Sequence, residues 1–129
     1  MQPRPLRVDA GNVVKTGAGT LTLLAVNYYT GSTVVSNGVL NFTTPQSISG
    51  PLTVNDGATL AIAATQDATY VAPSSLTLGN STGATLQFAL FGASSPLLNP
   101  SSVTIHGTAT INIGSCPFVS GVSYPLINN

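Results

Sequence analysis

A short block recurs along the chain, in which a glycine precedes a run of alternating aliphatic residues and mostly threonine. The five blocks begin at Gly19, Gly38, Gly57, Gly83 and Gly107. These glycines are 19, 19, 26 and 24 residues apart, close to the length of one coil of a solenoid. One coil cannot bury its apolar face alone, so a repeat of this length must stack on its neighbours. The repeat therefore predicts an all-β solenoid of about five coils.

A second short strand is predicted before each of the last three blocks, at residues 52–54, 76–78 and 103–105. Residues two apart in a strand share a face. This alternation predicts a core of Leu52, Val54, Leu60, Ile62, Leu76, Leu78, Leu86, Phe88, Val103, Ile105, Ile111 and Ile113. The opposite face is predicted to carry Thr53, Thr59, Thr77, Thr85, Thr104 and Thr110. Each of these coils should thus contain a strand, a tight turn and a second strand.

The pairing of the strands distinguishes the solenoid from its main alternative, an antiparallel β-sandwich. In a solenoid, residues 60–62 pair in parallel with the coils before and after, and the five glycines form an approximate column. In a sandwich, residues 60–62 pair with 52–54 in a hairpin across Asn55-Asp56. The connections 63–73 and 89–100 contain prolines, which end strand pairing, and are expected to bulge from one side of the stack. The length of 129 residues fits a single domain over residues 1–129.

Charged residues make up 5% of the chain, against about 25% in ordinary soluble domains. There is no Glu, and the three Asp residues are widely separated, whereas glycosidases need two carboxyl groups about 5–9.5 Å apart. Arg4, Arg7 and Lys15 are the only cations, too few for a nucleic-acid surface. No apolar run approaches the roughly 18 residues of a membrane helix. We therefore expect no catalysis, no metal site, no cofactor, no nucleic-acid partner and no membrane insertion.

Four residues are candidates for contacting a glycan, namely Tyr28, Tyr29, Asp67 and Tyr70. A tyrosine ring can stack on a sugar, and loops of rigid scaffolds often hold binding residues. His106 and the Asp56-Gly57 and Asn37-Gly38 pairs are interpreted as turn residues. Cys116 lacks a neighbouring base or cation that would activate its thiol.

Residues 13–42 read VVKTGAGTLTLLAVNYYTGSTVVSNGVLNF, and this segment resembles the autotransporter-associated β-strand repeat of bacterial secreted and surface proteins. The blocks KTGAGTLTL and NYYTG carry the resemblance, and GVSYPLI at 121–127 is similar to a strand that often follows such repeats. The resemblance implies a right-handed parallel β-helix at an extracellular or cell-surface location. It also implies a structural or display role within a larger secreted protein, beside neighbouring domains of the same chain. The functional alternatives are a carbohydrate-binding module on the same scaffold, recognising a polysaccharide or other surface glycan, and a β-helical polysaccharide lyase or hydrolase.

Neither end of the predicted solenoid has an obvious cap. Unpaired strand edges invite pairing with another chain, and this sequence has few charges to oppose it. We expect homo-oligomers that form through the ends of the solenoid.

Overall fold

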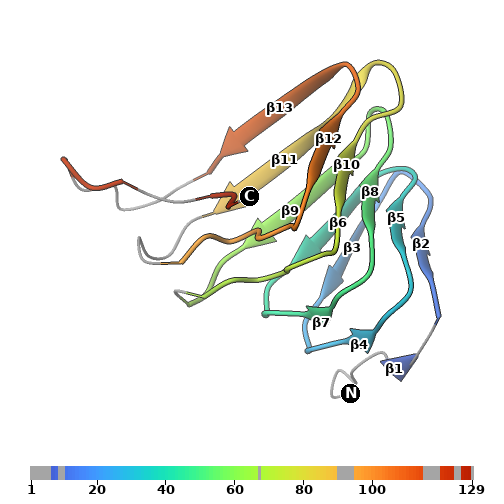
Figure 1. Ribbon diagram of the computed structural model, residues 1–129, viewed down its shortest axis with the longest axis horizontal. Coiled ribbons are helices and arrows are strands. Elements are labelled where there is room, and N and C mark those ends of the chain that lie inside the picture. Colours follow the sequence, from blue (N-terminus) through green and yellow to red (C-terminus); the bar gives the residue numbers. More distant parts are fainter. Residues whose placement is uncertain are drawn as a thin grey trace.

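The computed structural model describes residues 7–8, 11–66, 68–89, 95–114, 120–123 and 126–128. Over these residues the chain forms strands that all pair in parallel, joined by turns and loops, and no helix (Figure 1). The strands are β1 (Arg7–Val8), β2 (Val13–Lys15), β3 (Thr20–Leu23), β4 (Tyr28–Tyr29), β5 (Thr33–Val35), β6 (Val39–Phe42), β7 (Ser47–Ile48), β8 (Leu52–Val54), β9 (Thr59–Ala63), β10 (Leu76–Leu78), β11 (Gly83–Ala89), β12 (Val103–Ile105) and β13 (Thr108–Ile113). The parallel arrangement confirms the predicted β-helix.

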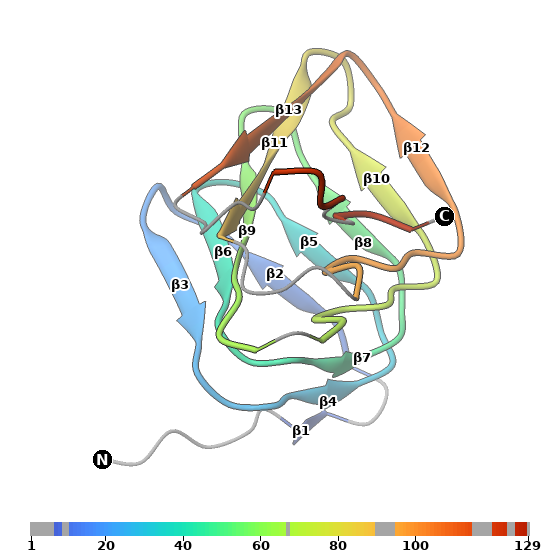
Figure 2. The same cartoon turned by 90° about the vertical axis from the view of Figure 1, so that its left-hand side faces the viewer.

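The strands form three sides around a common interior (Figure 2). Side A contains β1, β4 and β7, side B contains β2, β5, β8, β10 and β12, and side C contains β3, β6, β9, β11 and β13. Five successive layers therefore stack along sides B and C, which makes about four complete turns from layer 1 (β2 and β3) to layer 5 (β12 and β13). Residues 60–62 pair with β6 and β11 and not with β8. The hairpin that would have indicated a sandwich is absent at this position.

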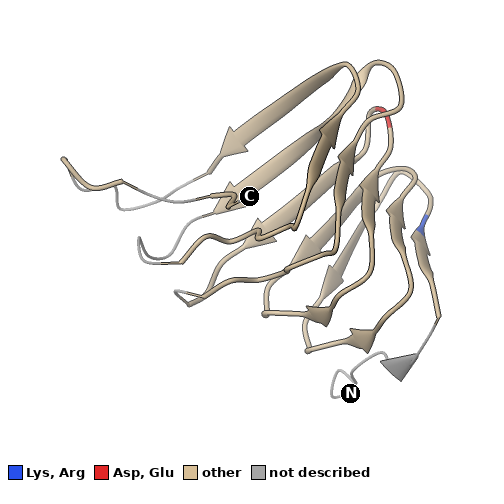
Figure 3. Ribbon diagram, in the orientation of Figure 1, with Lys and Arg blue, Asp and Glu red and all other residues tan. Residues whose placement is uncertain are grey.

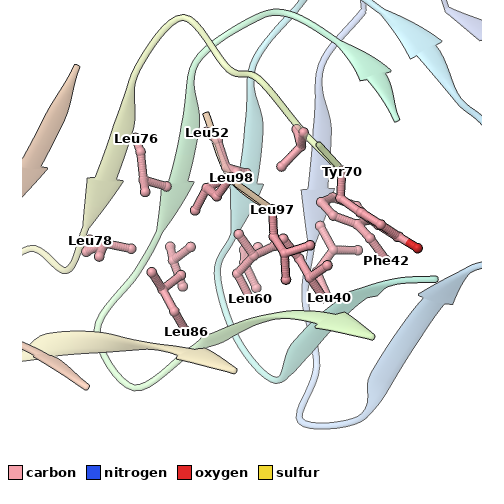
Figure 4. Packing of buried hydrophobic residues seen from close by; sticks show 14 of the residues in the cluster. Leu40, Phe42, Leu52, Leu60, Tyr70, Leu76, Leu78, Leu86, Leu97 and Leu98 are labelled. Atoms are coloured by element: carbon pink, nitrogen blue, oxygen red, sulfur yellow. The ribbon is translucent and has the colours of Figure 1, made fainter. Parts of the chain in front are cut away.

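The register places like side chains above one another in inward-facing columns. On side C one column is Leu21, Leu40, Leu60, Leu86 and Ile111, and the next is Leu23, Phe42, Ile62, Phe88 and Ile113. The eight predicted core residues in layers 3 and 4 are all buried. Figure 4 shows how the leucines of these layers meet inside the solenoid. The alternation of aliphatic residues thus determines the core of the middle layers.

The connections after β9 and β11 contribute to the core, contrary to the expectation that they bulge from the stack. Val71 and Leu98 form parallel bridges that continue side A, and Leu98 also pairs with Ile127. The side chains of Tyr70, Val71, Leu97 and Leu98 are fully or almost fully buried. Apolar side chains at these positions close the third side of the solenoid, which β4 and β7 close in the earlier layers.

The predicted glycine column is only partly present. Gly19 lies opposite Gly38, but Ala58 and not Gly57 lies opposite Gly38 in layer 3. Gly57, the residue before Ala58, lies opposite Gly83 of layer 4. Gly38, Gly57 and Gly107 have positive φ angles at the turn from side B to side C, where glycine is favoured. That turn differs in length between layers, so the glycine shifts relative to the strand that follows.

A buried amide pair holds the corner between sides C and A in the first two layers. The Gln46 side-chain oxygen accepts hydrogen bonds from the backbone N–H of Asn27 at 3.1 Å and from its side-chain amide at 2.8 Å. The Gln46 side-chain amide nitrogen donates to the carbonyls of Ala25 at 3.1 Å and Thr44 at 2.8 Å. These bonds satisfy the Gln46 amide, as buried polar groups require.

The inward-facing columns are exposed where the described layers end. Leu21 is 41% exposed in layer 1, and Ile105, Ile111 and Ile113 are 52%, 47% and 47% exposed in layer 5. Ile105, Ile111 and Ile113 were predicted to be buried core residues, and this prediction is wrong. Their register nevertheless places them in the inward-facing columns. Among the residues that the structure describes, no further layer packs over these three side chains on sides B and C.

Candidate functional site

A shallow hollow of about 230 Å³ lies on the outer surface of side C. It crosses the sheet from β3 and β6 to β9 and β11, because its lining residues are Thr20, Val39, Asn41, Ala61, Ile62, Ala63, Gln87 and Ala89. Strand neighbours are spaced by about 4.8 Å, so four adjacent strands span roughly 14 Å along the solenoid axis. A hollow of this length can accommodate a short stretch of an extended polymer.

The register explains the hollow. Asn41, Ala61 and Gln87 are neighbours in one outward-facing column, so an alanine lies between two long amide side chains. Ala63 and Ala89 are likewise paired on β9 and β11. The small alanine side chains leave space that the flanking Asn41 and Gln87 side chains border.

The chemistry of the hollow is neutral and suits hydrogen bonding. None of its lining residues is charged, and the amides of Asn41 and Gln87 each offer donors and an acceptor. The Asn41 amide nitrogen is 3.5 Å from the Thr22 hydroxyl oxygen, at the outer limit of a hydrogen bond. These groups could bind a hydroxyl-rich neutral molecule, but none of them is a general acid, a general base or an activated nucleophile.

The structure separates the tyrosines that were predicted to contact a glycan. Tyr28 is 46% exposed on β4, whereas the neighbouring Tyr29 is buried. The hydroxyl groups of Tyr29 and Thr33 are hydrogen-bonded at 2.7 Å, and burial raises the pKa of Tyr29. Tyr70 is also buried, and its hydroxyl oxygen accepts hydrogen bonds from the backbone N–H groups of Thr65 at 2.6 Å and Gln66 at 3.2 Å.

Tyr29 and Tyr70 are buried, so of the three predicted tyrosines Tyr28 is the one whose ring could stack on a sugar. Glycan contact at Tyr28 stays a prediction. Tyr28 lies on side A and is not among the residues that line the hollow on side C. Asp67, the fourth predicted residue, lies outside the described residues.

Asp56 binds the turn of the next layer. Its carboxylate accepts hydrogen bonds from the backbone N–H groups of Asn80 at 2.7 Å, Ser81 at 3.0 Å, Thr82 at 3.0 Å and Gly83 at 2.9 Å. The Ser81 hydroxyl donates a further bond at 3.1 Å. These donors, with the Gly83 N–H contributing most, hold the pKa of Asp56 well below its ordinary range. The carboxylate therefore joins layers 3 and 4, which extends its predicted role as a turn residue.

Lys15 occupies an inward-facing position of layer 1 and is almost fully buried. Its ammonium group donates hydrogen bonds to the carbonyl oxygens of Thr16 at 2.7 Å, Gly17 at 2.8 Å and Asn37 at 3.3 Å. The Asn37 bond ties layer 1 to the turn of layer 2. Backbone carbonyls thus compensate the buried charge.

The other candidate residues are not brought together. His106 is exposed in the turn between β12 and β13, and Cys116 lies outside the described residues. Within the described ranges, no three His, Cys, Asp or Glu side chains gather where they could hold a metal ion. The same ranges contain no helix that is long and apolar enough to cross a membrane.

The hollow was not identified from the sequence. Asn41, Ala61 and Gln87 are 20 and 26 residues apart, and only the register of the layers makes them neighbours. The outward alanine at position 61 was the available signal, but the unequal coil lengths concealed which residues flank it.

Comparison with known proteins identifies one segment of the chain. Searches among curated proteins and among solved structures found no match. Residues 13–42, which begin with the first residue of β2 and end with the last residue of β6, match the passenger-associated-transport-repeat family.

Proposed function

We propose that this chain is a structural segment of a bacterial autotransporter passenger or a similar extracellular protein, acting as a rigid spacer or display support without catalysis. The observation that carries the proposal is the match of residues 13–42 to the passenger repeat. The matched segment makes more than one turn of the solenoid, from side B of layer 1 to side C of layer 2.

The layers beyond the matched segment support the same role. The ladders of sides B and C continue without interruption from β6 to β13, although residues 43–129 lie outside the match. A ladder of parallel strands is a stiff support, because each layer is hydrogen-bonded to its neighbours along its length. The charged side chains of Lys15 and Asp56 bind backbone groups, which leaves neither of them available for chemistry.

Localisation can be tested in the source bacterium with antibodies against the recombinant chain. We expect the antigen on intact cells or in the culture medium, and we expect external protease to remove the cell-bound signal. A cytoplasmic protein serves as the control for lysis. Antigen found solely in the cytoplasmic fraction would contradict the proposal.

The absence of catalysis can be tested with a panel of polysaccharides. We expect no new reducing ends and no unsaturated products, because Asp56 is engaged with the turn at residues 80–83. Turnover by the wild type that disappears in Asp56→Asn or Asp67→Asn would overturn the structural assignment.

A second candidate is glycan binding on the same scaffold, and the neutral hollow on side C favours it. A neutral polysaccharide strand is the ligand class that its amides and uncharged lining would suit. The proposed contacts are hydrogen bonds from Asn41 and Gln87, with the sugar ring lying over Ala61. The hollow contains no aromatic stacking surface, so we expect weak binding.

Affinity gel electrophoresis with neutral polysaccharides can locate such a site. Ala61→Phe should abolish retardation by filling the hollow, and Asn41→Ala with Gln87→Ala should weaken it. Thr53→Ala, an outward position on side B, is the matched control. Retardation that survives these changes but is lost in Tyr28→Ala would place the site on side A instead, and no retardation with any polysaccharide would reject glycan binding.

A further inference from the structure

The turn between β5 and β6 contains the only Asn-Gly pair of the chain, Asn37-Gly38. An asparagine followed by glycine is chemically labile, because glycine has no Cβ to hinder attack by its own backbone nitrogen. Asn37 is exposed to water. We propose that Asn37 is a self-modification site, at which the folded chain converts the side-chain amide into a carboxylate with the help of Lys15.

The reaction has two steps, and its atoms balance. The Gly38 nitrogen loses its proton and attacks the side-chain carbonyl carbon of Asn37, which forms a five-membered imide and releases ammonia. Water then opens the imide and leaves a carboxylate on an aspartate or an isoaspartate at position 37. The reaction needs no oxidant and no reductant, and each chain reacts once, so it is not turnover.

The structure places the attacking nitrogen beside its target. The Gly38 N–H donates a hydrogen bond to the side-chain oxygen of Asn37 at 2.9 Å. The following residue differs, because the Val39 N–H donates to the carbonyl of Gly19 in the ladder of side C. The Gly38 nitrogen is thus directed to the side chain that it must attack, and such proximity lowers the barrier to reaction.

Lys15 supplies electrostatic help to the same step. Its ammonium group donates to the backbone carbonyl oxygen of Asn37 at 3.3 Å, and this carbonyl belongs to the same peptide group as the Gly38 nitrogen. When that nitrogen loses its proton, the negative charge spreads onto the carbonyl oxygen. A cation already positioned at the oxygen stabilises this charge without reorganisation. Lys15 therefore acts through its bond to the backbone and is not itself consumed.

The packing of the turn holds this arrangement in place. Lys15 is almost fully buried, and its ammonium group also binds the carbonyls of Thr16 and Gly17. Gly38 has a φ of +71°, and a Cβ added to it would lie 2.8 Å from the Lys15 ammonium nitrogen. A residue with a side chain would not fit there, so the turn itself requires the glycine that makes Asn37 labile.

The corresponding turn of layer 4 provides an internal comparison. Asn80 is also exposed, and the nitrogen that would have to attack its side chain is that of Ser81. The Ser81 N–H donates to both carboxylate oxygens of Asp56, at 3.0 and 3.1 Å. A negative charge beside this nitrogen opposes the loss of its proton. Asn37 has a cation at its reacting peptide group and Asn80 has an anion, so Asn37 should react and Asn80 should not.

The test incubates the folded chain in mildly alkaline water labelled with heavy oxygen, followed by isoelectric focusing and peptide mass spectrometry. The formal net charge of zero should fall by one unit, and the label should enter at Asn37 and not at Asn80. Asn37→Ser keeps a turn-forming residue without an amide, and the charge of this variant should stay constant. Equal labelling of Asn37 and Asn80 would overturn the proposal.

Lys15→Met tests the contribution of the cation. We expect the folded variant to react about tenfold more slowly than wild type, the loss expected for one hydrogen bond to a charged group. In urea the two chains should react at equal rates, because unfolding removes the Lys15 contact from wild type. Circular dichroism would confirm that the variant folds. A merely loosened turn would not produce the slowing, since a freer chain reaches the imide geometry more easily.

The wild type alone provides a test that does not depend on the folding of any variant. Because of the Lys15 contact, we expect the folded chain to react at least as fast as the same chain in urea. A slower reaction in the folded chain would overturn the proposal, because it would show that the fold protects Asn37. An unchanged charge in the folded wild type, or equal rates in folded wild type and folded Lys15→Met, would overturn it as well.

Discussion

Truncation to alanine within one inward-facing column of side C is expected to reduce the free energy of unfolding by an amount that depends on the layer. Leu60 lies in layer 3 and is 1% exposed, whereas Ile111 lies in layer 5 and is 47% exposed. Both belong to the column that also contains Leu40 and Leu86. Truncation of each to alanine therefore compares a closed environment with an open one in the same structural position.

The magnitudes follow from burial. Replacing a buried leucine by alanine removes transfer free energy and leaves a cavity, at a cost of about 2–5 kcal/mol. Leu60 has layers packed on both sides, so we expect Leu60→Ala to cost about 3–4 kcal/mol. About half of Ile111 is already in water and no closed cavity forms, so we expect Ile111→Ala to cost about 1–1.5 kcal/mol.

Urea unfolding followed by circular dichroism measures both values, with dilute protein to keep it monomeric. Stacked layers can unfold separately, so the two costs are compared only if the slope of the free energy against urea concentration is the same in wild type and variants. A cost below about 1 kcal/mol for Leu60→Ala, or equal costs for both variants, would refute the inference that the middle layers are closed and layer 5 is open.

Three further predictions concern single side chains. Gly38→Ala should destabilise the protein more than Gly57→Ala. Both glycines have a positive φ, but only at Gly38 would an added Cβ collide with the carbonyl oxygens of Gly17 and Gly19. Equal urea midpoints for the two variants would contradict this. Because its folded-state pKa is lowered, Asp56 contributes stability that is fully present above its ordinary pKa of about 4 and is lost progressively as the pH falls below it. The Asp56→Asn variant should therefore be less stable than wild type at pH 7 and lose less stability on acidification, and parallel pH profiles would be the contrary result. Gln46→Leu should cost about 1–3 kcal/mol, because the backbone N–H of Asn27 loses the acceptor that Gln46 supplies; an unchanged melting temperature would reject this.

The sequence predicted those parts of the fold that depend on local patterns. Leu76 and Leu78 flank Thr77 in a three-residue strand, and this alternation alone identifies the buried face. The parallel pairing also followed from the repeat, because similar coils stack in register. Tyr70 and Leu98 were missed as core residues because their burial depends on the closing of side A, which no local pattern indicates.

The candidate site was less predictable for the same reason. Tyr28 and Tyr29 are adjacent in a strand, so alternation already implies that only one of them can face outward, and the structure places Tyr28 there. The hollow required knowledge of register across coils of different length, since Gln87 follows Ala61 by 26 residues. Local alternation could not supply that register.

Lys15 and Asp56, two of the few charged residues of the chain, both form hydrogen bonds between layers. Figure 3 shows how little of the described chain carries charged residues. Lys15 donates to a carbonyl of the next layer, and Asp56 accepts from N–H groups of the next layer. Both side chains thus strengthen contacts between layers instead of repelling other molecules from the surface. In the part of the chain that the structure describes, these two charged side chains therefore bind the backbone of a neighbouring layer, and β12 and β13 themselves contain no Lys, Arg, Asp or Glu.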